Sequence, residues 1–101
     1  MMYVLDEQLR RSNAQKYIVY CESTRVVLSI DHEIAENYVS SRLVHQLGIP
    51  IVPHPKPHYL EDRDIVTRQC TFWFSEGFFD GRIQCNEIHL LHSDIILDGN
   101  G

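Results

Sequence analysis

The sequence predicts an all-β fold, mainly antiparallel, with one short helix. Runs rich in β-branched and aromatic residues recur along the chain, and turn-forming residues separate them. Four prolines lie between residues 49 and 57 and exclude a helix there. The 101 residues, of which 44% are hydrophobic, suffice for one core. We expect a domain over residues 16–101, preceded by an N-terminal extension or edge strand over residues 1–15.

The first predicted strands form a hairpin. Residues 16–21 and 25–30 are rich in Val, Ile and Tyr, which favour strands. Residues 22–24 supply Glu, Ser and Thr for the turn between them. The hairpin therefore places Asp31 at the end of its second strand.

The rest of the chain predicts a helix, a second hairpin and further strands. Apolar residues at helical spacings precede Gly48, which favours the end of a helix; they are Tyr38, Val39, Leu43, Val44 and Leu47. Residues 49–57 predict an edge strand or a connecting segment. Residues 58–66 predict a hairpin with its tip near Asp62 and Arg63. The remaining strands are predicted at residues 69–74, 82–90 and 93–97.

Charge and cysteine content restrict the class of protein. The net charge is −5, and no basic cluster exists beyond Arg10 and Arg11, so we expect no nucleic-acid partner. No apolar run is long enough to span a membrane, and the first residues lack an apolar signal core. Three widely spaced cysteines are typical of reduced thiols. An intracellular location, cytoplasmic or nuclear, is therefore expected.

Asp31 is the first candidate for a functional residue. It follows an apolar strand, and a carboxylate in such a place is costly unless it is hydrogen-bonded or used in chemistry. A short polar turn follows it, and the amphipathic segment comes next.

A longer pattern surrounds this aspartate. After the turn, residues 37–50 combine an Asn-Tyr-Val-Ser-Ser segment with a helix that ends in Leu-Gly-Ile-Pro. This order resembles the retropepsin-like aspartic proteases of Ty3/gypsy-type retrotransposons, over residues 16–98. The resemblance implies the half-barrel of acid proteases, with the last motif of the family at residues 94–97. It also implies a flap hairpin, which would comprise Leu60, Glu61, Asp62, Arg63 and Asp64.

By this resemblance, Asp31 occupies the position of the catalytic aspartate. An aspartic protease needs two carboxylates about 3 Å apart that share one proton, so a chain of this size would act as a symmetric dimer. The turn departs from the family pattern, because Ser/Thr, Gly, Ala and Thr/Ser are replaced by His32, Glu33, Ile34 and Ala35. A side chain at Glu33 crowds the turn, and additional carboxylates beside a desolvated pair repel it.

These departures favour a fold that is retained without its chemistry. We expect a retrotransposon-derived, non-proteolytic domain that serves as a protein-interaction or dimerisation module of a larger protein. Its partner would be a protein, a peptide or a second copy of the chain, and no cofactor is expected. The alternative is an active dimeric aspartic endopeptidase that uses Asp31 from each subunit.

The histidines and cysteines do not form a metal motif. His54 and His58 are separated by prolines, and no Cys-x2-Cys pair exists. His89 and His92 form a second spaced pair, but surface histidines and buried thiols are the simpler interpretation. No metal site is expected.

An aromatic run is the second candidate for a functional surface. In a strand, Phe72 and Phe74 share one face while Trp73 points to the other. An outward Trp73 near Phe78 and Phe79 would form an apolar patch suited to a protein partner. The alternative is that all of these side chains pack inside the domain.

Overall fold

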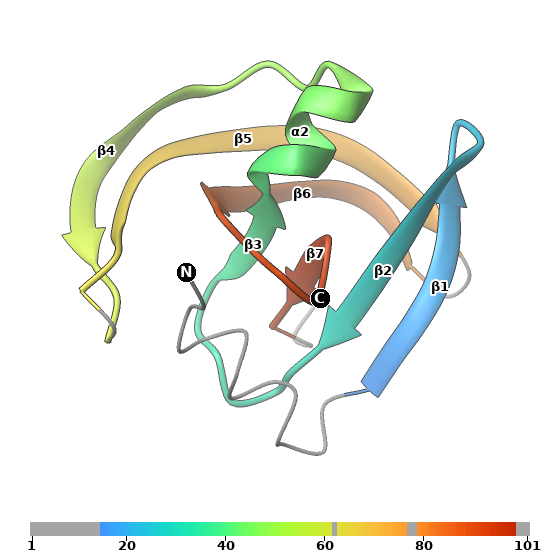
Figure 1. Cartoon of the computed structure of the whole chain (residues 1–101), viewed down its shortest axis with the longest axis horizontal. Coiled ribbons are helices and arrows are strands. Elements are labelled where there is room, and N and C mark those ends of the chain that lie inside the picture. The colour runs from blue at the N-terminus through green and yellow to red at the C-terminus, as the bar shows by residue number, and fades with distance from the viewer. Residues whose placement is uncertain (1–14, 62, 77–78, 99–101) are drawn as a thin grey trace.

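The computed structural model describes residues 15–61, 63–76 and 79–98. Within these residues, seven strands form one curved sheet, and a single short helix packs against it (Figure 1). The all-β class with one short helix is thus confirmed. Except for Gln15, which opens the first strand, the predicted N-terminal extension lies outside the described residues. In chain order the elements are β1 (Gln15–Cys21), β2 (Thr24–Ile30), β3 (Asn37–Ser40), α2 (Ser41–Leu47), β4 (Val52–Tyr59), β5 (Ile65–Glu76), β6 (Phe79–Ile88) and β7 (Ile95–Leu97).

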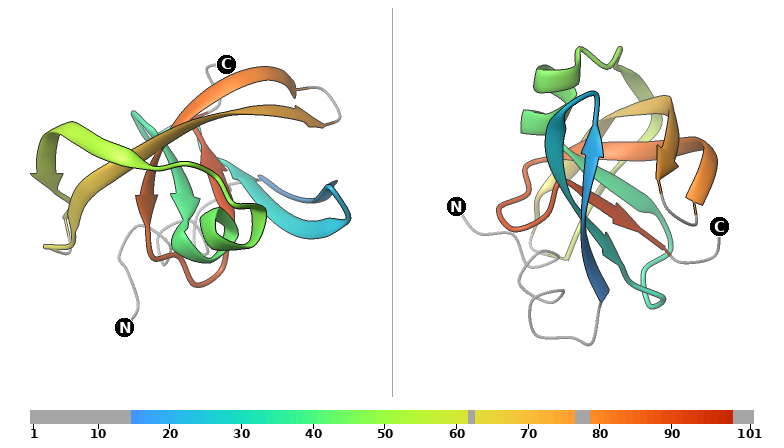
Figure 2. Two further views of the ribbon diagram at one scale, coloured as in Figure 1. Left: turned by 90° about the horizontal axis from the view of Figure 1, so that it is seen from above. Right: turned by 90° about the vertical axis from the view of Figure 1, so that its right-hand side faces the viewer.

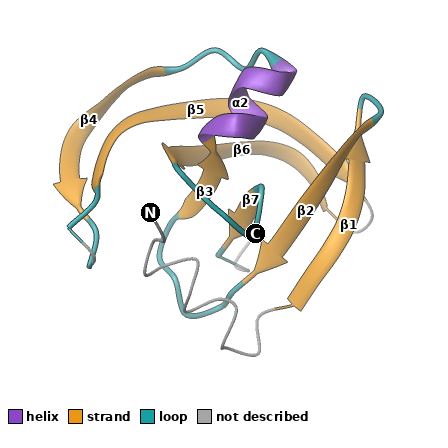
Figure 3. Ribbon diagram, viewed as in Figure 1, coloured by secondary structure: helices purple, strands orange, loops and turns teal. Residues whose placement is uncertain are grey.

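The sheet is mixed, because β7 enters it between β2 and β3 (Figure 3). The strand order is β1-β2-β7-β3-β6-β5-β4. The hairpin pairs are antiparallel, as expected, but β7 runs parallel to β2, and β3 runs parallel to β6. The sequence did not predict these parallel pairs. The parallel β2–β7 pair begins where the backbone N–H of Asp94 donates to the carbonyl of Val27 at 2.8 Å, beside the middle of β2.

The first hairpin has a two-residue turn. Glu22 and Ser23 have positive φ angles of 49° and 72°, as a type I′ turn requires, and Cys21 pairs with Thr24 across it. Figure 2 shows this β1–β2 hairpin from two further directions, together with the long, curved strands β5 and β6.

The helix is shorter than the periodicity predicts. Tyr38 and Val39 belong to β3, where they pair with both β6 and β7. The helix begins only after Ser40, whose Oγ accepts a hydrogen bond from the backbone N–H of Leu43 at 3.0 Å. Pairing on both sides of β3 therefore overrides the helical spacing of Tyr38 and Val39. The predicted end at Gly48 is confirmed, with a left-handed φ of 65°.

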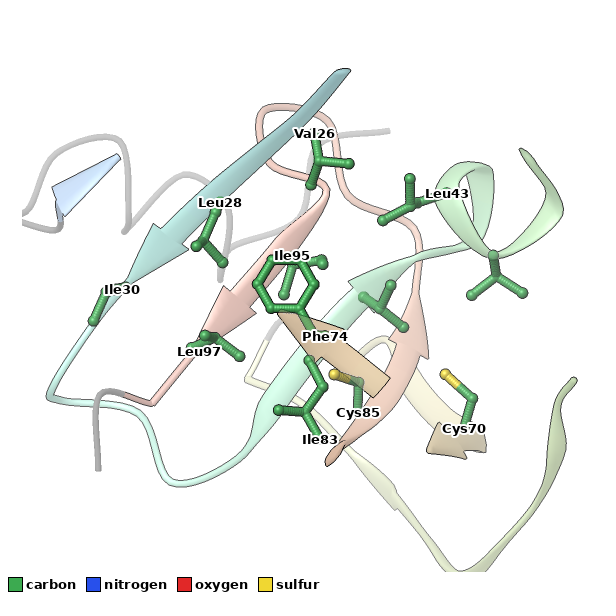
Figure 4. Packing of buried hydrophobic residues seen from close by; sticks show 12 residues of the cluster. Val26, Leu28, Ile30, Leu43, Cys70, Phe74, Ile83, Cys85, Ile95 and Leu97 are labelled. Atoms are coloured by element: carbon green, nitrogen blue, oxygen red, sulfur yellow. The ribbon is translucent and has the colours of Figure 1, made fainter. Parts of the chain in front are cut away.

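Two clusters of buried side chains form the core. The larger cluster joins β2, β3, α2, β5, β6 and β7, and Phe74, only 2% exposed, lies among its members (Figure 4). The smaller cluster comprises Tyr38, Val66, Ile88, Leu90 and Ile96. Ile34 from the turn after Asp31 and Leu60 from the β4–β5 hairpin pack against this second cluster. The core therefore connects two of the predicted site segments.

Candidate functional site

Asp31 lies at the joint end of two central strands. Its backbone N–H donates to the carbonyl of Leu97 at 2.9 Å, which ties the end of β2 to the end of β7. The residue is buried, with 9% of its surface exposed. Its Oδ1 accepts a hydrogen bond of 2.9 Å from the backbone N–H of Glu33, and its Oδ2 accepts none from the described residues. Within the described part of the chain, the carboxylate is therefore hydrogen-bonded through one oxygen only.

The four residues after Asp31 diverge in their surroundings. His32, Glu33 and Ala35 are exposed, whereas Ile34 is half-buried against the smaller core cluster. Ile34 thus anchors the turn. The backbone N–H of Glu33 donates to the Asp31 carboxylate, while the side chain of Glu33 lies on the surface. The sequence predicted that a side chain at this position would crowd the turn. Within one chain, the turn accommodates it by pointing it outward.

Asn37 fixes the far end of this turn. Its Oδ1 accepts a hydrogen bond from the backbone N–H of Asp98 at 2.9 Å, and its Nδ2 donates to the carbonyl of Gln84 at 3.3 Å. The side chain therefore bridges the segment after β7 and the strand β6. Sequence reasoning noted Asn37 only as part of a family motif. Its position between a polar turn and a strand was the available signal, since amides at such places often cap a backbone.

A cavity of about 700 Å³ opens beside the turn. Its lining includes Ile30, Glu36 and Asn37 from β2, the turn and β3, and Arg82 and Asn86 from β6, while Asp31 itself does not line it. Asn86 is only 5% exposed, and its Nδ2 donates to no acceptor within the described residues. A buried amide without an acceptor is costly, so a ligand carbonyl that reached it would be bound favourably.

The β4–β5 hairpin, which includes the predicted flap, lies against the same turn. Its tip is closed by hydrogen bonds from the N–H of Leu60 to the carbonyl of Asp64, 2.7 Å, and from the N–H of Arg63 to the carbonyl of Leu60, 3.0 Å. Asp62 lies outside the described residues, while Glu61 and Arg63 are exposed.

A polar contact reinforces this arrangement. His58 Nε2 of β4 lies 3.3 Å from Glu36 Oε2, in the turn after Asp31. Together with the packing of Leu60 and Ile34 on one cluster, this contact joins the hairpin to the turn. Sequence reasoning missed both His58 and Glu36 in this role, because a pair formed across 22 residues of chain leaves no local pattern.

Asp94 is a second buried carboxylate, and it is surrounded by partners. Its Oδ2 accepts a hydrogen bond of 2.7 Å from the backbone N–H of Val27, and its Oδ1 accepts one of 2.7 Å from Arg42 of the helix. Its backbone carbonyl accepts a hydrogen bond from the N–H of Ser40 at 2.8 Å. Asp94 therefore joins β2, β3 and α2 in one place, a structural role that the sequence alone did not assign.

The thiols and histidines are dispersed. Cys70 and Cys85 face each other across β5 and β6 and are buried. Burial, with a smaller contribution from the charge of Glu87, raises the pKa of the Cys70 thiol to about 11, and burial also raises the pKa of Cys85. The rings of His54 and His58 pack edge to face with centroids 5.2 Å apart. Across the described part of the chain, no three potential ligands gather in the way that a metal ion requires.

The aromatic side chains of β5 alternate between the two faces of the strand. Trp73 is 66% exposed, whereas Phe74 is buried and Phe72 packs against the larger core cluster. Trp73 lies opposite Arg82 in the adjacent strand. Phe78 and the side chain of Phe79 lie outside the described residues, so the predicted patch around Trp73 stays a prediction.

None of the helices among the described residues has the length and apolar character needed to cross a membrane. No family model, no curated protein and no solved structure matches the chain.

Proposed function

We propose that this chain is a retrotransposon-derived, retropepsin-like domain, a half-barrel that no longer cleaves peptides and binds a protein partner as a module of a larger protein. Support for the relationship comes from the sequence motif and from the position of Asp31 beside the end of β7. The hairpin at the expected flap position also contacts the turn through Leu60 and His58.

The observation that carries the loss of activity is the exposed side chain of Glu33, two residues from Asp31 and bonded to it through the backbone. A proteolytic dyad brings two such turns together around one shared proton. In that arrangement, each subunit would add the carboxylate of Glu33 and the ring of His32 to the contact. Like charges in a desolvated site repel and raise the pKa values of the carboxylic acids, so the dyad would not form in its active state.

Binding of an extended peptide segment is supported by the cavity beside the turn. Asn86 offers a buried N–H donor that has no acceptor among the described residues, and Arg82 adds a cation to the lining of the cavity. Carbonyl groups of an extended peptide are suitable acceptors for both. The exposed Trp73, opposite Arg82, extends this surface with an apolar side chain of the kind enriched in protein interfaces.

The alternative function is an active dimeric aspartic endopeptidase. One observation favours it: Asp31 is buried, and its Oδ2 accepts no hydrogen bond within the described residues, so that oxygen is available to a water or a second carboxylate.

A cleavage assay separates the two functions. The wild-type chain and Asp31→Asn are incubated with a mixed peptide library from acidic to neutral pH, and new termini are counted by mass spectrometry. We expect the two chains to give the same background. Cleavage by the wild-type chain that Asp31→Asn abolishes would overturn the proposed function and establish the endopeptidase.

Binding is tested with an array of extended peptides. We expect Arg82→Ala to lower the affinity for the peptides that the wild-type chain binds by about tenfold, the usual loss for one charge-assisted hydrogen bond. Arg25→Ala is the matched control, because Arg25 is exposed on β2 and does not line the cavity. Equal loss in both variants would contradict a binding site in the cavity.

A further inference from the structure

The two edges of the sheet differ in their ability to pair with another strand. At one edge, β4 carries Pro53, Pro55 and Pro57, which have no backbone N–H to donate. The N–H of Lys56, between two of them, is already bonded to Nδ1 of His54 at 2.9 Å. This edge is therefore blocked against the addition of a strand.

The other edge, β1, is open within the described part of the chain. Because the turn has two residues, Cys21 and Thr24 form a hydrogen-bonded pair, and the hydrogen-bonded positions alternate from there. The backbone N–H and C=O groups of Lys16, Ile18 and Tyr20 consequently point away from β2. No proline interrupts this strand, so it presents a continuous row of donors and acceptors.

Two of the three outward side chains near this edge are aliphatic or aromatic, whereas exposed edge strands often carry charged residues. Ile18 is 50% exposed and Tyr20 is 58% exposed, and both lie on the same face of the strand as Lys16. The intervening side chains, Tyr17, Val19 and Cys21, pack against the larger core cluster instead.

We infer that β1 pairs antiparallel with β1 of a second copy of this chain, about a two-fold axis at Ile18. In this register Ile18 faces Ile18 of the second copy, and Lys16 faces its Tyr20. All three outward positions of each strand then form hydrogen-bonded pairs. The contact is self-complementary, as a two-fold interface requires.

Charge and side-chain chemistry agree with this register. No like charges face each other, because each Lys16 lies across from an aromatic ring. Glu22 of the second copy follows its Tyr20 by two residues, in the exposed turn, and adds a negative charge near this end of the contact. The same pairing occurs at both ends of the contact by symmetry, so the second copy is electrostatically complementary to the edge it covers.

This dimer deepens the proposed function, on which it rests for its biological role, by naming a partner. It also keeps the turn after Asp31 in one copy away from the same turn in the other. Asp31 lies one register step beyond the Gln15–Ile30 pair, near the outer end of the hairpin. With about 3.4 Å per residue and about 4.8 Å between strands, the two Asp31 residues would lie about 30 Å apart. They could not share a proton.

Cysteine cross-linking tests the register on the full chain. Cα atoms of a hydrogen-bonded antiparallel pair lie about 5.5 Å apart, within the range of a disulfide. We expect Ile18→Cys to form covalent dimers under mild oxidation, and mixed Lys16→Cys and Tyr20→Cys chains to cross-link more than either variant alone. The wild-type chain, which retains Cys21, sets the background, and Tyr59→Cys on the blocked edge is the matched control. Equal cross-linking of Ile18→Cys and Tyr59→Cys would overturn the proposal.

Sedimentation tests the affinity. Ile18→Lys places two ammonium groups at the axis and should weaken self-association at least about 100-fold, while the control Tyr59→Lys leaves it unchanged. Circular dichroism confirms that both variants fold. A wild-type chain that stays monomeric, or an association that Ile18→Lys does not change, would overturn the dimer, including the case in which a peptide of another protein occupies β1. Neither result bears on the proposed function, which is tested separately by cleavage that depends on Asp31 and by peptide binding that depends on Arg82.

Discussion

Asp31 and Asp94 are two buried carboxylates beside the same central strands, with 9% and 6% of their surfaces exposed. Their surroundings differ. Each oxygen of Asp94 accepts a hydrogen bond of 2.7 Å, one from Val27 and one from Arg42. From residues that the structure describes, Asp31 accepts a single bond, donated by the backbone N–H of Glu33. Burial alone therefore does not identify a functional carboxylate, whereas the number of partners separates a structural one from one that is left available.

Asp94→Asn is expected to have the largest effect on stability. The side-chain oxygen of asparagine can accept only one of the two hydrogen bonds that Asp94 accepts. Its –NH2 group would then face the second donor, and two donors cannot bond to each other. Loss of a charge-assisted bond and an unpaired donor should lower the free energy of unfolding by about 3 kcal/mol. Urea denaturation followed by circular dichroism measures this change. A loss below about 1 kcal/mol would show that Asp94 does not hold the three elements together.

The buried thiol of Cys70 adds a pH-dependent effect. Its folded pKa, about 11, lies above the ordinary value of 9.0, so its contribution to stability is complete below about pH 9 and is lost as pH rises toward 11. The free energy of unfolding, measured by urea denaturation, should fall more steeply between pH 9 and 11 in the wild-type chain than in Cys70→Ala, by about 1 kcal/mol at pH 10. If the free energy of unfolding falls equally with pH in both chains, a buried neutral thiol at this position is contradicted.

Arg42→Met tests the same contact by removing the residue that is paired with Asp94. The Arg42 side chain is 54% exposed, so its ion pair with Asp94 is screened by solvent. Asp94 retains the backbone donor of Val27, and we expect a loss of about 1 kcal/mol. A double-mutant cycle with Asp94→Asn measures the coupling between them. If the two losses simply add, the observed contact contributes nothing to stability.

Asp31→Asn should have the smallest effect. The amide oxygen still accepts the N–H of Glu33, and its –NH2 group takes the place of an oxygen that accepts nothing from the described residues. The free energy of unfolding should change by less than about 0.5 kcal/mol. The same urea titration measures it beside Asp94→Asn. A loss as large as that of Asp94→Asn would make Asp31 a structural carboxylate and remove the contrast.

The strands were predictable because their signals are local. The composition of β1 and β2, the prolines of β4 and the alternation around Phe72, Trp73 and Phe74 each act within a few residues. The helix start was wrong because Tyr38 and Val39 are held in a strand by β6 and β7, which lie far along the chain. Long-range pairing of this kind overrides a local period.

The candidate site also combines features that depend on neighbouring residues with contacts between segments far apart in the chain. The sequence identified Asp31 and its altered turn, because both depend on neighbouring residues. It did not identify the partners of Asp94, the bridge from His58 to Glu36 or the bonds of Asn37, since each joins segments that only the folded sheet brings together. The blocked and open edges of the sheet also required the strand order.

The separation of the two Asp31 carboxylates in a crystal structure of the self-associated chain tests the central claim most directly. The proposed function and the β1 interface together predict two carboxylates about 30 Å apart, each bonded to its own Glu33 N–H. Two Asp31 carboxylates about 3 Å apart across a two-fold axis, the geometry of a shared proton, would contradict the account and point to a working protease.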